Sequence, residues 1–211
     1  MKKLFLIVFS MMLVVDSYSA FESTYKPLQS EKILFINGNI LDGEGNELLD
    51  TDLLIGDGKI VAMGRGISVD DKDVKIIDAK NKWITPGIID IHSHMGVYPA
   101  PSVRTSSDGN EATSPVTAEV WAEHSMWVQD PQYALALKGG VTIFHVLPGS
   151  ANLIGGRGVT VKNLQRNTIQ SMKYPGAKHS LKMACGENPK RVYGNRGQAP
   201  STRMGNFAGY R

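Results

Sequence analysis

Two apolar segments that flank a short helical segment most constrain how this chain can fold. Residues 88–94 are largely apolar and end in two histidines, and residues 141–147 form a second apolar run. Between them, residues 130–138 begin with Asp130, a good helix N-cap, and are followed by Gly139. These residues predict a buried strand, a helix and a second buried strand, which in this order form a parallel sheet covered by helices. Further strands are expected at residues 159–161 and 179–184, with a helix over residues 163–174 between them.

The region that ends near residue 84 is predicted to consist of short β-strands. Its apolar segments lie at residues 32–36, 52–55, 59–63 and 74–77. Asn37-Gly38 and Asp57-Gly58 each follow one of these segments, and such dipeptides favour the tight turns of β-hairpins. A β-unit of roughly 50 residues buries too little surface to be stable alone. We therefore expect it to pack on the rest of the chain.

The first 19 residues have the layout of a secretory signal peptide. The Lys2-Lys3 pair precedes an apolar run at residues 4–15, and the small residues Ser17 and Ser19 follow. The run is shorter than the ~20 residues that a bilayer crossing needs, although a membrane anchor is the alternative interpretation. We expect cleavage before Ala20 and a mature protein that is exported, either periplasmic or secreted, without a membrane attachment.

The composition excludes several classes of protein. The 23 Lys and Arg residues against 20 Asp and Glu residues leave a net charge of +3, which is too small to indicate nucleic-acid binding. The single cysteine, Cys185, excludes an intrachain disulfide framework and a cysteine-rich zinc site. The chain has no Gly-x-Ser-x-Gly motif and no base next to Cys185, which argues against a serine or thiol nucleophile.

Asp90, His92 and His94 are the residues most suited to chemistry. Alternate residues of a strand point to one face, so these three side chains are expected to share a side. Two imidazoles in this spacing can bind one divalent metal ion. A bare His-x-His is an ordinary surface or core feature, but this one ends an apolar strand, where parallel sheets hold their active sites. The sequence therefore favours a metal site.

The sequence resembles a known family at these residues. The segment ITPGIIDIHSH at residues 84–94, preceded by a hairpin-rich β-region, resembles the opening of the amidohydrolase superfamily. VLPGSANLIGG at residues 146–156 and GENPKR at residues 186–191 resemble exported members near the imidazolonepropionase and dipeptidase branch. The resemblance implies an α/β fold in which residues 20–84 are part of a small β-sandwich. Residues 85–211 would then form the amino-terminal half of a TIM (β/α)8 barrel.

The resemblance also implies a site. His92 and His94 correspond to the metal ligands of the first barrel strand, and Lys182 to a lysine whose carbamate bridges two metal ions. A lysine at the surface or paired with a carboxylate is the alternative reading of Lys182, and Glu187 is a second candidate ligand. His145 is expected to be a histidine of the core or one that supports the metal ligands without binding the metal. The cofactor implied is a divalent metal, zinc by expectation, as one or two ions.

The activity implied is hydrolysis of a carbon–nitrogen bond in a small-molecule amide, dipeptide or cyclic amide by a metal-bound hydroxide. Lys190 and Arg203 are candidates for binding a substrate carboxylate. A complete barrel needs roughly 250 residues, so the general-base aspartate is expected beyond this chain. We therefore expect an amino-terminal fragment that is inactive alone. A non-catalytic remnant, a binding module and one half of a split enzyme, completed by a missing carboxyl-terminal half, are the alternatives.

Overall fold

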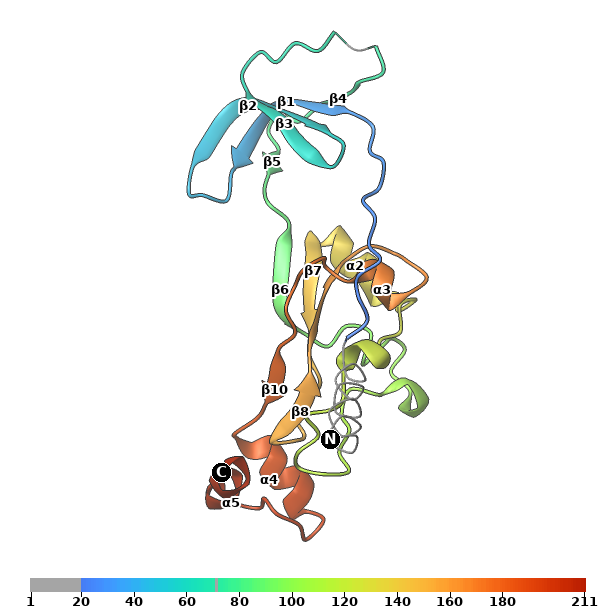
Figure 1. Cartoon of the computed structure of the whole chain (residues 1–211). Helices are drawn as coiled ribbons and strands as arrows, with labels where there is room; N and C mark the ends of the chain where they lie inside the picture. Colours follow the sequence, from blue (N-terminus) through green and yellow to red (C-terminus); the bar gives the residue numbers. More distant parts are fainter. Residues whose placement is uncertain (1–19, 71) are drawn as a thin grey trace, which may run out of the picture.

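The computed structural model describes residues 20–70 and 72–211, so the predicted signal peptide lies outside the described residues. The chain has a mixed α/β architecture, with a β-sheet at one end and two helices at the other (Figure 1). This confirms the α/β class predicted from the sequence. No helix in the described ranges has the length and apolar character that crossing a membrane requires.

The amino-terminal sheet has the strand order β3-β2-β1-β4, and a short fifth strand also pairs with β1. Its strands are β1 (Ile33–Leu41), β2 (Glu47–Gly56), β3 (Lys59–Gly64), β4 (Lys75–Asp78) and β5 (Trp83–Ile84). β1, β2 and β3 form an antiparallel meander, whereas β4 and β5 run parallel to β1. The predicted β-region is therefore confirmed as one sheet.

One of the two predicted hairpin turns is confirmed and the other is wrong. Asp57 and Gly58 connect β2 to β3 with φ of 51° and 71°, as a two-residue turn requires. Asn37 also has a positive φ, of 59°, but it lies inside β1, where the register with β2 shifts. A Cβ on Gly38 would lie 3.1 Å from the Ile84 side chain, so the glycine permits a close approach of β5 instead of a chain reversal.

The second part of the chain contains two small sheets and most of the helices. Its elements are β6 (Ile88–Ser93), η1 (Arg104–Ser106), η2 (Ala122–His124), α2 (Gln132–Lys138), β7 (Val141–Val146), β8 (Ile154–Arg157), β9 (Val159–Lys162), α3 (Ile169–Met172), β10 (Leu181–Met183), α4 (Glu187–Gly194) and α5 (Arg203–Tyr210). β6 and β7 are parallel and are connected through α2, as predicted. β9 runs antiparallel to β7, so the sheet β6-β7-β9 is mixed, and β10 pairs antiparallel with β8 in a sheet of two strands. The helix expected over residues 163–174 is reduced to the single turn of α3.

The core lies between β7, β9 and α2. Phe144, Val146 and Val161 are fully buried there, and the ring of Tyr133 from α2 contacts Phe144 at a centroid distance of 5.9 Å. Asp130 stabilises the start of α2, because its Oδ1 accepts a hydrogen bond of 3.0 Å from the backbone N–H of Gln132. Its other carboxylate oxygen accepts from the N–H of Gly96 at 3.2 Å, which connects α2 to the loop after β6.

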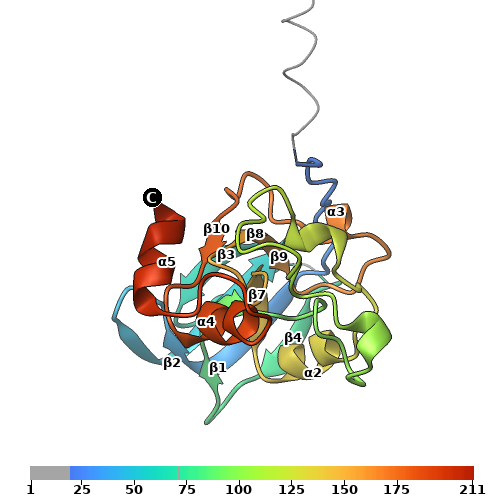
Figure 2. The same ribbon diagram turned by 90° about the horizontal axis from the view of Figure 1, so that it is seen from below.

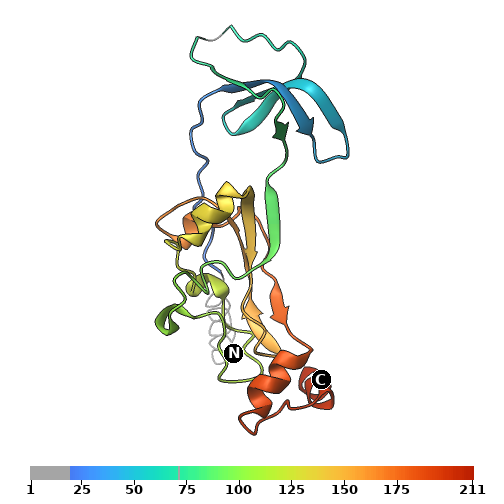
Figure 3. The same ribbon diagram turned by 180° about the vertical axis from the view of Figure 1, so that it is seen from behind.

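β6 is an exposed edge strand, and the prediction that it is buried is wrong. Ile91 is 77% exposed, and Ile88 and Ile89 are more than half exposed. The sheet has the order β6-β7-β9, so β6 has a neighbour on one side only, and no described element lies beyond it in opposite views (Figures 1 and 3). The apolar face of the strand therefore remains open to solvent in this chain.

The segment directly after residue 19 is held against the second part of the chain. Lys173 and Glu123 form a buried ion pair of 2.5 Å, with 7% and 1% of their side chains exposed. The Lys173 ammonium also donates to the backbone oxygen of Phe21, and the hydroxyl of Ser23 donates to the Lys173 carbonyl at 2.7 Å. The residues that follow residue 19 accordingly lie beside α3 (Figure 2).

Candidate metal centre

His92 and His94 lie together at the carboxyl end of β6. Their ring centroids are 5.4 Å apart and the ring planes are nearly perpendicular, at 82°. The Asp90 carboxylate instead accepts a hydrogen bond of 3.0 Å from the backbone N–H of His92. The structure therefore brings the two predicted imidazole ligands together, while the aspartate of the same strand holds the backbone between them.

A backbone carbonyl sets the tautomer of His94. Its Nδ1 lies 2.9 Å from the oxygen of Leu147, and because a carbonyl only accepts, Nδ1 carries the proton. The lone pair of Nε2 is therefore available to a cation, as in metal sites where the second ring nitrogen donates to a carbonyl. Leu147 also donates its N–H to the oxygen of Ser93 at 2.9 Å, which keeps the ends of β6 and β7 in register.

Lys182 approaches His92 from β10, although the two residues are 90 positions apart. The Lys182 Nζ lies 3.1 Å from the His92 Nε2. Burial lowers the pKa of Lys182. The pKa of His92 is lowered first by the positive charge of Lys182, then by burial and by His94. An imidazole and an amine that have lost their protons both present lone pairs, so these two nitrogens are potential ligands of a divalent cation.

A hydrogen-bonded histidine fixes the start of β10. The Nε2 of His145 lies 2.7 Å from the Ser180 hydroxyl, and its Nδ1 lies 2.9 Å from that of Thr160. The Ser180 carbonyl accepts from the N–H of Gly158 at 3.0 Å. Burial lowers the pKa of His145, with a smaller contribution from His179, so the ring is neutral at pH 7. His145 is thus half-buried and hydrogen-bonded on both nitrogens. Its partner Ser180 lies two residues before Lys182 in the sequence.

The second candidate ligand does not join this group. The side chain of Glu187 is 80% exposed and approaches only Arg191, at 4.0 Å. Among the described residues, no three His, Cys, Asp or Glu side chains lie close enough together to hold a metal ion. The described donors are therefore His92, His94 and the amine of Lys182.

A polar pocket of about 260 Å³ opens beside His94. Its polar side chains are His94, Tyr98, Asn110, Ser150, Asn188 and Arg191. The predicted anion-binding residues Lys190 and Arg203 do not line it, and Arg191 takes that place. Both basic residues belong to the GENPKR segment at residues 186–191, and nothing in the sequence shows that Arg191 and not Lys190 lines the pocket.

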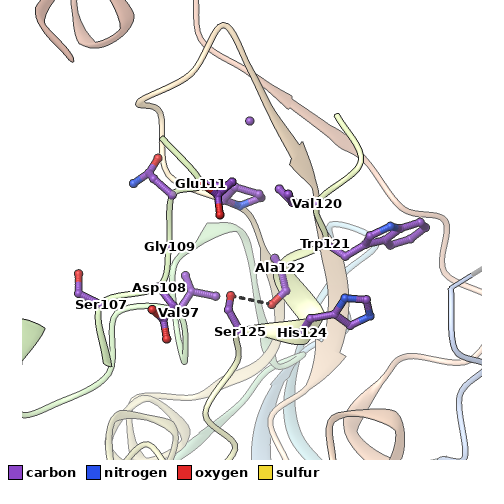
Figure 4. Close-up of a pocket in the computed structure, with 13 residues that line it drawn as sticks. Val97, Ser107, Asp108, Gly109, Glu111, Val120, Trp121, Ala122, His124 and Ser125 are labelled. Atoms are coloured by element: carbon purple, nitrogen blue, oxygen red, sulfur yellow. Dashed lines mark hydrogen bonds between the residues drawn. The ribbon is translucent and has the colours of Figure 1, made fainter. Parts of the chain in front are cut away.

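A second pocket is lined by residues of the loop that follows β6 and of η2 (Figure 4). Asp108, Glu111, Trp121 and His124 line it, and the Ser125 hydroxyl donates to the Ala122 carbonyl at 3.2 Å. Neither His92 nor Lys182 lines this pocket. It is therefore separate from the histidine pair.

Comparison with known proteins identifies the family, although no family model matches the chain. The amidohydrolase tasK of Hapsidospora irregularis is 35% identical over 171 residues, which are 76% of this chain and 17% of that protein. A dihydroorotase of Bacillus cytotoxicus is 44% identical over 62 residues, or 29% of this chain and 14% of that protein. A solved amidohydrolase of Thermotoga maritima is 41% identical with a TM-score of 0.74, and the match covers 83% of this chain and 45% of that one.

The mixed α/β fold and the two histidines at a strand end agree with the arrangement that the sequence resemblance implies. The chain belongs to the amidohydrolase superfamily, which confirms the resemblance read from the sequence. It spans less than half of the length of each of these relatives. Its assignment to the imidazolonepropionase and dipeptidase branch stays a prediction.

Proposed function

We propose that the protein carrying this chain is a metal-dependent hydrolase of carbon–nitrogen bonds in amides, dipeptides or cyclic amides. The observation that carries the proposal is the convergence of His92, His94 and Lys182 from two strands far apart in the sequence. The names of the relatives, two amidohydrolases and a dihydroorotase, support the same chemistry.

His92, His94 and Lys182 would hold the metal, with zinc the ion that suits imidazole ligands best here. Lys182 would take part as a carbamate, which forms only from a neutral amine, and its lowered pKa favours that form. When bound, the cation supplies Lewis acidity, which polarises a carbonyl and lowers the pKa of water. Leu147 fixes the neutral tautomer of His94 in which Nε2 is the nitrogen that can face the cation, and Asp90 orients the backbone that carries His92.

We also propose that residues 85–211 are the first half of a (β/α)8 barrel and that residues 20–84 belong to a β-sandwich. The parallel β6–α2–β7 unit supports the barrel, because it is the repeating unit of that fold. The exposed Ile88, Ile89 and Ile91 on β6 support a further part of the barrel that would cover this edge, either in the same polypeptide or in a second one. Export to the periplasm or medium is proposed from the layout of residues 1–19 alone.

The test is metal-dependent hydrolysis by the whole protein that contains this sequence. The zinc-loaded protein should release amine from N-acyl amino acids or dipeptides, and a chelator should stop the reaction. His92→Ala and His94→Ala should each abolish hydrolysis and lower zinc affinity by more than the roughly 10–100-fold that loss of an outer partner costs.

His124→Ala is the matched control, because that ring is 56% exposed and lines the other pocket. It should keep both hydrolysis and zinc. Unchanged hydrolysis in the His92→Ala protein would contradict the proposal.

A further inference from the structure

We infer that the pocket beside His94 is a carboxylate subsite, so that the preferred substrates carry a free carboxylate close to the carbon–nitrogen bond that is cut. This inference rests on the proposed function and deepens it.

The charge of the pocket favours an anion. Among the described residues that line it, Arg191 is the one with a formal charge, and no carboxylate is present. A guanidinium is a planar donor that binds a carboxylate through two parallel hydrogen bonds, and it remains charged at any physiological pH. Five neutral polar side chains surround it, and they can donate to an anion without repelling it.

Hydrogen bonds hold two donors in place across the pocket. Arg191 donates from Nη2 to the Oδ1 of Asn188 at 3.2 Å, and Asn188 donates from Nδ2 to the Ser150 hydroxyl at 2.6 Å. Because the Ser150 oxygen accepts, its own hydrogen is left to donate to a ligand. Asn188 therefore connects the guanidinium and the hydroxyl and orients both, which reduces the entropy lost on binding.

The present partner of Arg191 on α4 does not prevent this role. The Arg191 Nε lies 4.0 Å from the Glu187 carboxylate, and these side chains are 58% and 80% exposed. An exposed ion pair at this separation contributes little, since solvent screens it. A substrate carboxylate in the pocket can therefore replace Glu187 at the guanidinium.

The size and place of the pocket make it part of a larger site. Ligand pockets usually enclose about 300–1,000 Å³, whereas this one has about 260 Å³, enough for one small group. His94, a proposed metal ligand, lines the same pocket as Arg191. A carboxylate held by Arg191 thus places the neighbouring amide of the same molecule near the histidines.

Binding to the metal-free whole protein tests the inference without relying on turnover. The probes are N-acetylglycine and its uncharged counterpart N-acetylglycinamide, titrated by NMR or calorimetry. We expect the wild type to bind the carboxylate about tenfold more tightly, the size of effect that a hydrogen bond to a charged group produces. Arg191→Gln should abolish this preference, and Arg191→Lys should keep the preference with weaker binding.

Arg104→Gln is the matched control, because Arg104 is an exposed arginine in η1 that does not line the pocket. It should bind both probes as the wild type does. Equal affinities for the two probes, or an unchanged preference in Arg191→Gln, would overturn the inference.

Hydrolysis by the zinc-loaded protein separates this result from the proposed function. If the protein hydrolyses an N-acyl amino acid and its methyl ester at the same kcat/KM, the subsite is refuted while the function stands. If the metal-loaded protein hydrolyses neither, the proposed function fails, whatever the binding preference. A higher KM for the free acid alone in Arg191→Gln, with kcat unchanged, supports both.

Discussion

The Nζ atom of Lys182 lies 3.1 Å from the Nε2 of His92, although the two residues belong to different sheets. Two protonated bases at this distance repel each other, and both have a lowered pKa. The chain thus holds two basic nitrogens at one point, next to the ring of His94. This pair is the part of the candidate centre that substitution can test most directly.

Removal of Lys182 should raise the pKa of His92. The positive charge of Lys182 is the first cause that lowers it, so Lys182→Met should return it towards its usual value near 6.5. An NMR titration of the His92 ring in the metal-free protein measures the change. Lys138→Met, in α2, is the control and should leave the pKa of His92 as it was.

A second substitution of Lys182 tests the proposed carbamate. Lys182→Ala should lose hydrolysis, and short carboxylates such as acetate should restore part of it by replacing the missing oxygens. A Lys182→Ala protein with wild-type turnover, or a pKa of His92 that does not rise, would show that this lysine has another role.

The contact between His145 and Ser180 should matter for the metal centre as well as for stability. Ser180→Ala removes one hydrogen bond, so we expect the free energy of unfolding to fall by about 1 kcal/mol. Because Ser180 begins the segment that carries Lys182, zinc affinity should also fall, by roughly 10–100-fold. Ser180→Thr keeps the hydroxyl and should recover most of the affinity.

Chemical denaturation and zinc competition with a chelator measure these two effects separately. A loss of stability in Ser180→Ala with zinc affinity unchanged would mean that the bond only supports the fold.

Loss of one partner of the buried pair Glu123–Lys173 should strongly destabilise the chain. Glu123→Leu leaves the Lys173 ammonium buried without its carboxylate, so we expect a loss of about 3–5 kcal/mol. The double variant with Lys173→Leu removes both charges and should be much more stable than Glu123→Leu. Denaturation in urea gives the three values, and additive losses would contradict a coupled pair.

Processing of the amino terminus is a further prediction. If residues 1–19 are a signal peptide, the exported protein should begin at Ala20, and sequencing of its amino terminus checks this. Replacing Ser19 with a large residue such as Tyr should slow cleavage, because the processing enzyme requires small side chains there. Material from the cell envelope that still starts at Met1 would refute the prediction.

The features that could be predicted from the sequence depend on neighbouring residues. The turn at Asp57-Gly58 and the hydrogen bond from Gln132 to Asp130 depend on local backbone preferences, and both were predicted. Asn37-Gly38 has the same local preference for a turn. However, β1 pairs with strands on both of its sides, and the strand therefore continues through this dipeptide. Local patterns do not contain that information.

In the candidate site, too, some features follow from local sequence and others depend on distant segments. The proximity of His92 and His94 follows from strand geometry, whereas the approach of Lys182 was expected only from the family resemblance. The antiparallel direction of β9 and the place of Arg191 in the pocket had no local signal. Both depend on how distant segments pack, which a single sequence does not specify.

The contacts of Lys173 have a consequence for the order in which the chain can fold. Phe21 and Ser23 meet this lysine across 152 and 150 positions of sequence, so the first described residues find their partners only after most of the chain has been synthesised. Contacts of such long range form slowly, because the entropy of closing a large loop must be overcome first. Phe21 and Ser23 therefore stay accessible to other proteins at least until Lys173 has been synthesised.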